Sequence, residues 1–311
     1  MNILFMGTPD FAVFSLESLL ASSHRVVGVV TQPDKPRGRG YALCPPPVKE
    51  AALKAGIEVY QPTTLRDESF AELLSKLAPD VIVVVAYGKI LPQNVLDFPK
   101  YGCINVHGSL LPEYRGAAPM QRAIIDGKRV TGITTMYMEA GLDTGDMLLS
   151  EELPIEDSDN FETIHDKLGA LGASMIVKTL DELLAGTLCR TKQDDSLANY
   201  AQKITKEDCL VSFDRDARSV HNLIRGLSPI PLAFTHTPDG KLLKLVSSEI
   251  VEESAEHGVP VGTVLSLDSG IVIACGRGSV RITKVLPEGK GRMSAADFIR
   301  GRKIFTGDVL S

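Results

Sequence analysis

The feature that most constrains the fold is an apolar run of β-branched residues at positions 80–86 (DVIVVVA). Such a run is typical of a central strand in a parallel sheet that is covered on both faces. The chain opens with a matching pattern: an apolar run at 2–6, an amphipathic segment to about Ala21, and a second apolar run at 26–30. This β-α-β order builds parallel sheets, because the crossover helix returns the chain to the same edge.

The remainder of the first 191 residues continues to alternate between helix and strand. Periodicity predicts helices at 48–55, 66–77, 119–125 and 160–185, and strands at 57–60, 131–138 and 147–153. The predicted fold class is therefore α/β, a Rossmann-like, doubly wound, mostly parallel sheet. Gly7 follows the first strand without the pattern G-x-G-x-x-G, which excludes a dinucleotide-binding fingerprint there. His165 falls in the long helix, and we interpret it as a surface residue.

The pattern changes after a polar segment at 192–206, which we interpret as a linker between domains 1–191 and 207–311. One helix is expected at 216–225, and a last helix is capped by Ser294. Between them lie five short β-patterned runs, at 232–235, 242–251, 262–267, 270–274 and 280–285. About five strands in a small domain indicate a C-terminal OB-like β-barrel.

Charge differs between the two parts of the chain. Residues 201–311 contain 15 Lys and Arg against 13 Asp and Glu, whereas the first 200 contain 18 against 26. Residues 201–311 are thus mildly positive beside an acidic N-terminal part, a weak indication of an anionic partner. The overall charge of −6 argues against a globally basic nucleic-acid binder.

Composition places the chain among soluble proteins. It has 311 residues, of which 44% are hydrophobic, and no apolar run approaches the ~18 residues of a membrane span. Five cysteines without a C-x-x-C pair fit reduced thiols rather than a disulfide framework or a zinc site, so no metal is expected. The N-terminus lacks the pattern of a signal peptide. We expect a cytoplasmic protein without a membrane partner.

Polar side chains gather in the stretch at 103–112 (CINVHGSLLP). Successive side chains of a strand point to opposite faces, so Cys103, Asn105 and His107 share one face. Gly108 ends the strand, and open α/β sheets bind ligands at the carboxyl ends of their strands. Cys103 and His107 are four residues apart, roughly 13 Å, so we do not interpret Cys103 as a nucleophile.

A carboxylate follows one strand-helix-strand unit later. Asp143 lies between Gly141 and Gly145, whose backbones permit a tight turn. Aspartate is also common in turns for purely structural reasons. Together, Asn105, His107 and Asp143 fit acyl transfer without a covalent enzyme intermediate: an amide for the oxyanion, an imidazole for the proton, and a carboxylate that orients the imidazole.

Two further segments are open to a functional and a structural reading. Residues 87–92 (YGKILP) follow the central strand and either line a ligand pocket or pack in the core. Residues 31–47 form a Pro- and Gly-rich segment that is too long for an ordinary connection. Its cations Lys35, Arg37 and Arg39 suit either an arm that meets a phosphate backbone or a solvated loop.

The stretch NVHGSLLP at 105–112, followed by GLDTG at 141–145, resembles the signature of the formyltetrahydrofolate-dependent formyltransferases. The resemblance implies that Asn105, His107 and Asp143 are catalytic and that 10-formyltetrahydrofolate donates the formyl group. It also implies that the loop after His107 contacts the folate. The candidate folate-binding residues are therefore Ser109, Leu110, Leu111 and Pro112, with Tyr87, Gly88, Ile90 and Leu91 from the neighbouring segment.

Four features resemble the branch of this family that formylates methionyl initiator tRNA. They are GTPDF at 7–11, the loop at 31–47, YRGAAP at 114–119, and a C-terminal barrel. The resemblance implies that the loop enters the acceptor-stem region of the tRNA and that Arg39 is its key arginine. The predicted partners are this tRNA and the folate, with the protein as a monomer. The alternatives are a formyltransferase for an aminosugar nucleotide or glycinamide ribonucleotide, and a non-catalytic folate- or RNA-binding regulator.

Overall fold

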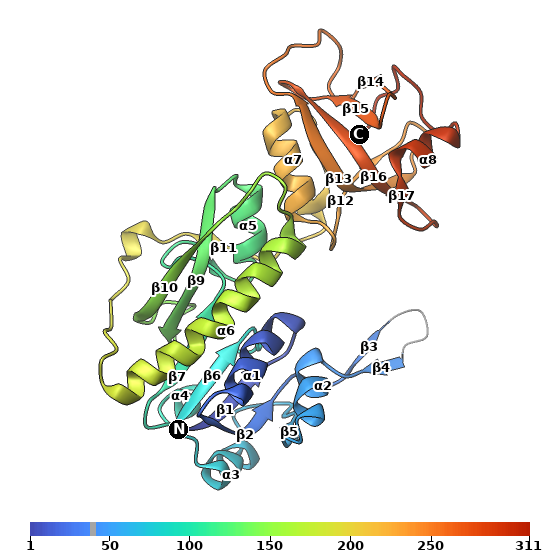
Figure 1. Cartoon of the computed structure of the whole chain (residues 1–311). Coiled ribbons are helices and arrows are strands. Elements are labelled where there is room, and N and C mark those ends of the chain that lie inside the picture. Colours follow the sequence, from blue (N-terminus) through green and yellow to red (C-terminus); the bar gives the residue numbers. More distant parts are fainter. Residues whose placement is uncertain (38–41) are drawn as a thin grey trace. The chain divides into compact units, whose positions relative to one another are not determined.

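The computed structural model describes residues 1–37 and 42–311 (Figure 1). The chain forms two compact units, and the first comprises residues 1–116, 130–154 and 165–201. The second comprises 117–129, 155–164 and 202–311. Two short segments that precede the predicted linker, 117–129 and 155–164, therefore belong to the second unit. A division of the chain at one linker does not predict this.

The first unit is built on a seven-stranded sheet with the order β10-β9-β7-β6-β1-β2-β5. The strands are β1 Asn2–Gly7, β2 Arg25–Val30, β5 Val59–Tyr60, β6 Val81–Val85, β7 Cys103–His107, β9 Val130–Tyr137 and β10 Met147–Pro154. The first five run parallel, and β9 is antiparallel to both β7 and β10. The predicted α/β class with a mostly parallel sheet is confirmed.

Helices cover both faces of this sheet (Figure 1). They are α1 Asp10–Ala21, α2 Pro47–Lys54, α3 Glu68–Leu77, α4 Gln93–Leu96 and α6 Phe161–Ala185. Side chains of α3 and α4 share one core with the Leu4 face of β1. The opposite face packs on α6, where an added Cβ at Gly172 would lie 2.9 Å from Cγ1 of Val106. Gly172 thus permits close packing of helix on sheet and does not interrupt the helix.

His165 is not the plain surface residue that we expected. Its side chain is 14% exposed, and its ring lies beside the ring of Phe11, with centroids 5.4 Å apart. Nε2 lies 3.4 Å from the Asp10 carboxylate, and Nδ1 lies 2.9 Å from that of Asp166. These contacts, led by the one to Asp10, raise the pKa of His165 against the opposing effect of burial. Sequence periodicity misses this because Asp10 is contributed by α1.

The segment at 31–47 contains a short antiparallel hairpin of β3 Lys35–Arg37 and β4 Ala42–Cys44. The sequence analysis predicted a loop here and no strands. A charged cluster holds its base: Lys49 Nζ donates at 2.8 Å to the Asp34 carboxylate and to Gln61. Arg39 lies outside the described residues.

The second unit contains an antiparallel sheet with the path β12-β13-β16-β15-β14, and β17 pairs with β16. The strands are β12 Ala233–His236, β13 Leu242–Glu252, β14 Val264–Ser266, β15 Ile271–Ala274, β16 Ser279–Pro287 and β17 Met293–Ser294. All five predicted strand runs are present, and the half-barrel that they form is consistent with the predicted OB-like domain.

The helices of this unit are α5 Pro119–Ile125, α7 Ala217–Gly226 and α8 Ala295–Arg300. The predicted cap of α8 is present, since Ser294 accepts a hydrogen bond from the Asp297 N–H. The guanidinium of Arg225 on α7 is buried, and it donates to the carbonyls of Glu156 and Asp159 at 2.8 and 3.0 Å. These hydrogen bonds explain why the segment at 155–164 belongs to this unit.

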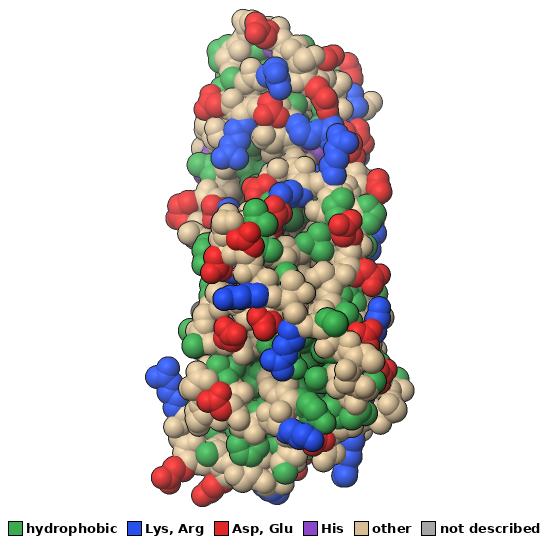
Figure 2. Space-filling model, turned by 90° about the vertical axis from the view of Figure 1, so that its left-hand side faces the viewer, with side chains coloured by type: hydrophobic (Ala, Val, Ile, Leu, Met, Phe, Trp, Pro, Cys, Tyr) green, Lys and Arg blue, Asp and Glu red, His purple; other side chains and the backbone are tan. Residues whose placement is uncertain are grey.

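The surface carries charge of both signs. On the face drawn in Figure 2, Lys and Arg side chains are interspersed with Asp and Glu side chains. Among the described residues, no helix combines the length and the hydropathy that crossing a bilayer requires.

Candidate active site

The two polar residues of β7 lie on one face of the strand, as the period-2 pattern predicts. Asn105 pairs with Val84 of β6, and His107 pairs with Thr134 of β9. Both side chains are largely buried, at 9% and 6% exposure. Within residues 1–37 and 42–311, no group hydrogen-bonds to the side-chain amide of Asn105. The amide donor at this position is therefore available to a bound molecule.

The contacts of His107 determine which ring nitrogen carries its proton. Nε2 lies 2.9 Å from the carbonyl oxygen of Tyr114, and a carbonyl only accepts hydrogen bonds, so Nε2 donates. In the neutral ring, Nδ1 is then the basic nitrogen. Nδ1 lies 3.8 Å from Oδ2 of Asp143, so the carboxylate faces the position that becomes positively charged on protonation.

The loop after β9 brings Asp143 to His107, as the sequence predicts. Asp143 adopts a left-handed backbone conformation with φ of 52°, which Asp tolerates better than most residues. Its Oδ2 accepts a hydrogen bond of 2.8 Å from the N–H of Gly116. Gly145 lets the loop lie close to the end of β9, because an added Cβ would fall inside the contact distance of the Tyr137 carbonyl oxygen.

Residues 114–116 support both members of this pair, which the sequence did not reveal. The Tyr114 carbonyl accepts from His107, and the Gly116 N–H donates to Asp143. Tyr114 and Gly116 both have positive φ, 58° and 115°. The Tyr114 N–H donates to the side chain of Asn199, and β8 Arg115–Gly116 pairs with β11 Tyr200–Ala201. The support thus comes from the segment interpreted as a linker.

The candidate folate loop after β7 is held in place by Thr134. Its Oγ1 donates to the Ser109 carbonyl at 2.8 Å and accepts from the Leu111 N–H at 3.1 Å. The Ser109 hydroxyl donates to the Glu113 carbonyl at 2.7 Å. The serine side chain therefore stabilises the loop, and the Leu111–Pro112 peptide bond is cis. The Leu110 side chain lies over Gly132 of β9.

The second candidate folate segment divides into core and surface residues. Tyr87 and Leu91 are 2% and 4% exposed and belong to the core, whereas Ile90 is 81% exposed. Burial raises the pKa of Tyr87 to about 12, so its hydroxyl stays protonated at neutral pH. Gly88 has a φ of 84°, which turns the chain at the carboxyl end of β6. Gly88 and Ile90 are therefore better placed to meet a ligand than Tyr87 and Leu91.

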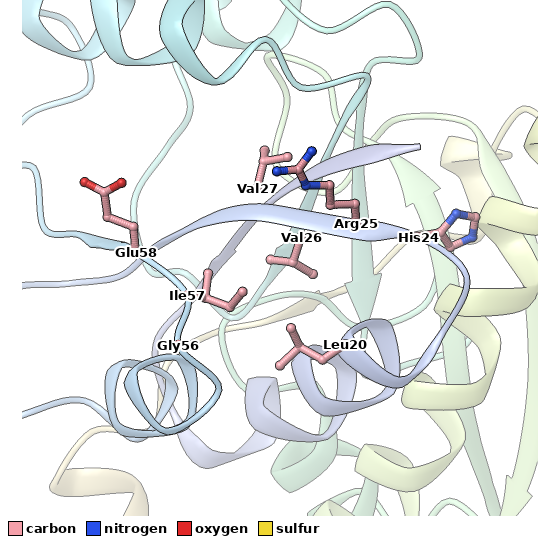
Figure 3. A pocket seen from close by; sticks show the side chains of 8 residues that line it. All are labelled: Leu20, His24, Arg25, Val26, Val27, Gly56, Ile57 and Glu58. Atoms are coloured by element: carbon pink, nitrogen blue, oxygen red, sulfur yellow. The ribbon is translucent and has the colours of Figure 1, made fainter.

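The Cys103 thiol and a pocket at the start of β2 are not part of this site. Burial raises the pKa of Cys103 to about 12, so this thiol is not ionised at neutral pH. A shallow pocket lined by His24, Arg25 and Glu58 lies at the start of β2 (Figure 3). That is the edge opposite to the carboxyl ends of the parallel strands, so this pocket is separate from His107.

Comparison with known protein families shows to which family the chain belongs. The family described as "Formyl transferase" matches residues 1–180, and "Formyl transferase, C-terminal domain" matches residues 203–303. The chain belongs to the formyl transferase family. The sequence resemblance is therefore confirmed at the level of the family.

Curated relatives match this formyl transferase along its whole length. A methionyl-tRNA formyltransferase of Geotalea daltonii is 50% identical over 310 residues, covering 100% of this chain and 98% of the relative. One of Acetivibrio thermocellus is 49% identical over 311 residues, covering 100% and 99%.

Solved structures share the fold at lower identity. The N-formyltransferase of Helicobacter canadensis, in complex with folinic acid and dTDP-3-aminofucose, matches with a TM-score of 0.65 and 17% identity, over 90% of this chain and 98% of that one. HypX of Aquifex aeolicus in complex with tetrahydrofolic acid matches with a TM-score of 0.62 and 18% identity. The match covers 96% of this chain but 47% of the HypX chain, so the chain spans about half of HypX.

Proposed function

We propose that the protein transfers the formyl group of 10-formyltetrahydrofolate to the α-amine of methionyl initiator tRNA. The observation that carries this proposal is similarity over the full length: two relatives with this named activity are about half identical to the chain and match both of its domains. The availability of Asn105 and the pairing of His107 with Asp143 support the reaction type.

The proposed mechanism proceeds through a tetrahedral intermediate. The neutral amine attacks the formyl carbon, and the Asn105 amide donates to the oxygen as negative charge develops there. Nδ1 of His107 accepts the proton that the amine nitrogen loses, and Asp143 stabilises the imidazolium. The bond from carbon to N10 then breaks, and the proton passes to N10 of the departing tetrahydrofolate. An α-amino group titrates near pH ~8, so modest basicity suffices.

The surroundings of β6 and β7 fit a folate. These strands are adjacent and parallel, so the segments that follow them lie at the same sheet edge. Ile90 exposes an apolar side chain there, and the hydroxyl of Tyr87 has no hydrogen-bond partner among the described residues. We propose that Gly88, Ile90 and the loop at 109–112 contact the folate, with Tyr87 and Leu91 packed behind them.

We propose that the hairpin of β3 and β4, with Lys35, Arg37 and Arg39, contacts the acceptor stem of the tRNA. The C-terminal domain is at 207–311 after a linker at 192–206, and residues 201–311 together carry 15 Lys and Arg against 13 Asp and Glu, a weak indication of an anionic partner. We further propose a cytoplasmic monomer, in keeping with five cysteines that lack C-x-x-C spacing.

The test is a rapid-quench, single-turnover assay with 10-formyltetrahydrofolate and three acceptors: methionyl initiator tRNA, glycinamide ribonucleotide and an aminosugar nucleotide. We expect formylation of the tRNA alone. His107→Ala and Asn105→Ala should each lower the single-turnover rate at least ~100-fold, the scale of a lost acid–base or oxyanion group. Transfer to a small amine, or full activity of either variant, would refute the proposal.

A further inference from the structure

One buried amide connects the Asp143 loop to the backbone that supports the site. Gln193 is 6% exposed and lies in the polar segment that follows α6. Its Nε2 donates to the carbonyls of Asp143 and Gly145, at 2.8 and 2.7 Å. Its Oε1 accepts from Nε and Nη2 of Arg115, at 3.0 and 2.8 Å.

These four hydrogen bonds use the whole capacity of the side chain. An amide offers two donor hydrogens and an oxygen with two lone pairs, and each is engaged once. The orientation is fixed, because a flipped amide would place its oxygen against two carbonyl oxygens and its NH₂ against a guanidinium. Of the common side chains at this length, glutamine alone satisfies both neighbours.

The partner of this amide is itself fixed. The Arg115 side chain is 2% exposed, and its Nη2 also donates to Asp195 at 2.8 Å. Arg115 lies between Tyr114 and Gly116, whose backbones contact His107 and Asp143. Gln193 therefore joins the loop of one proposed catalytic residue to the segment that touches both.

The Asp143 carboxylate accepts a hydrogen bond from the Gly116 N–H, whereas the residues at the tip of its loop are exposed. Leu142 is 57% exposed, and Asp143 has a left-handed backbone. The two hydrogen bonds from Gln193 hold carbonyls on either side of Thr144, so they fix the turn that aims the carboxylate.

We propose that Gln193 is a positioning residue that holds the Asp143 carboxylate against Nδ1 of His107. The inference rests on the catalytic role proposed above for Asp143. Its effect is indirect, since Gln193 contacts the loop backbone and not the reacting atoms. A displacement of about 1 Å at a reacting pair costs ~100-fold in rate, which sets the expected scale.

Gln193→Glu tests the proposal with little change in shape. The new carboxylate can still pair with Arg115, but it has no hydrogen to donate to the carbonyls of Asp143 and Gly145. We expect kcat to fall ~100-fold while KM for both substrates changes by less than ~3-fold. Gln193→Met, which removes the donors without adding an acceptor, should also lower kcat and serves if the first variant fails to fold. Wild-type kcat in either folded variant would overturn the proposal.

Two controls isolate the loop contact. Asn94→Asp makes the same amide-to-carboxylate change at an exposed position on α4 and should leave kcat unchanged. Asp195→Asn removes the charge that pairs with Arg115 from a side chain that is 82% exposed, and should change kcat by less than ~3-fold because such pairs contribute little. A 100-fold loss in Asp195→Asn would assign the effect to Arg115 and overturn the role given to Gln193.

A double-mutant cycle distinguishes positioning from general stability. If Gln193 acts through the Asp143 carboxylate, Gln193→Glu should have less than ~3-fold further effect in an Asp143→Asn background. An additive ~100-fold loss would show that Gln193 acts elsewhere. Full activity of the Asp143→Asn variant would refute the catalytic role of Asp143 itself. If Asp143→Asn loses activity while Gln193→Glu keeps the wild-type kcat, only the positioning role of Gln193 is refuted.

Discussion

Asp143→Asn is the most informative single change, because it removes charge and keeps shape. The asparagine oxygen can still accept the 2.8 Å hydrogen bond from the Gly116 N–H. Asparagine also tolerates a φ of 52°, so the loop should keep its conformation. The variant therefore isolates the electrostatic contribution of the carboxylate to the reaction.

The expected magnitude follows from the separation of the charges. A unit negative charge 3.8 Å from a protonated Nδ1 interacts with about 4 kcal/mol at an effective dielectric constant of about 20. The Asp143 side chain is 15% exposed, so solvent reduces this value. A loss of about 3–4 kcal/mol in the transition state corresponds to a ~100- to 1,000-fold decrease in kcat.

The assay is single-turnover formyl transfer at saturating folate and tRNA, with Asp268→Asn as control. Asp268 is exposed in the turn between β14 and β15, and its substitution should leave the rate unchanged. We expect unchanged KM in Asp143→Asn, since the carboxylate acts on charge that develops during reaction. A rate within ~3-fold of the wild type would refute the electrostatic role of Asp143.

Three further substitutions have expected outcomes that can be measured. Gly145→Ala should lower the free energy of unfolding by at least ~2 kcal/mol in urea titrations, because the new Cβ meets a carbonyl oxygen. The matched Gly291→Ala, with open space around its Cβ, should not lower it. Equal free energies of unfolding in the two variants would contradict this packing. His165→Gln should destabilise the protein by no more than ~1 kcal/mol. Because the folded-state pKa of His165 is raised, the difference in free energy of unfolding between wild type and His165→Gln should be fully present below pH ~6.5. It should disappear as pH rises through the folded-state pKa. A difference that grows with pH would contradict the contact with Asp10. Arg39→Ala should reduce the slope of log binding constant against log salt for tRNA by about 0.7–0.9, and an unchanged slope would exclude a phosphate contact.

The strands, the faces on which their side chains lie, and the proximity of His107 to Asp143 were predictable because they follow local rules. A period of two places Asn105 and His107 on one face, and parallel topology brings the carboxyl ends of β6 and β7 to one edge. The glycines Gly141 and Gly145 predicted a tight turn that presents Asp143. Each inference needs only neighbouring residues and the general chemistry of sheets.

Gln193 and Asn199 could not be found in this way. Their partners lie 50 or more residues away, at Asp143 and Tyr114, and a polar segment after a helix has the composition of a linker. The second unit shows the same difficulty, because Arg225 donates to the carbonyl of Glu156, which lies 69 residues earlier in the chain. Side-chain to backbone hydrogen bonds across long separations leave no periodic signal in the sequence.

The most direct test of the central claim is transfer of labelled formyl from 10-formyltetrahydrofolate to methionyl initiator tRNA, with methionyl elongator tRNA in parallel. Both acceptors carry the same amine, so a difference between them measures recognition of the tRNA body. We expect label on the initiator alone. No transfer to either acceptor, with folate still bound, would contradict the proposed function.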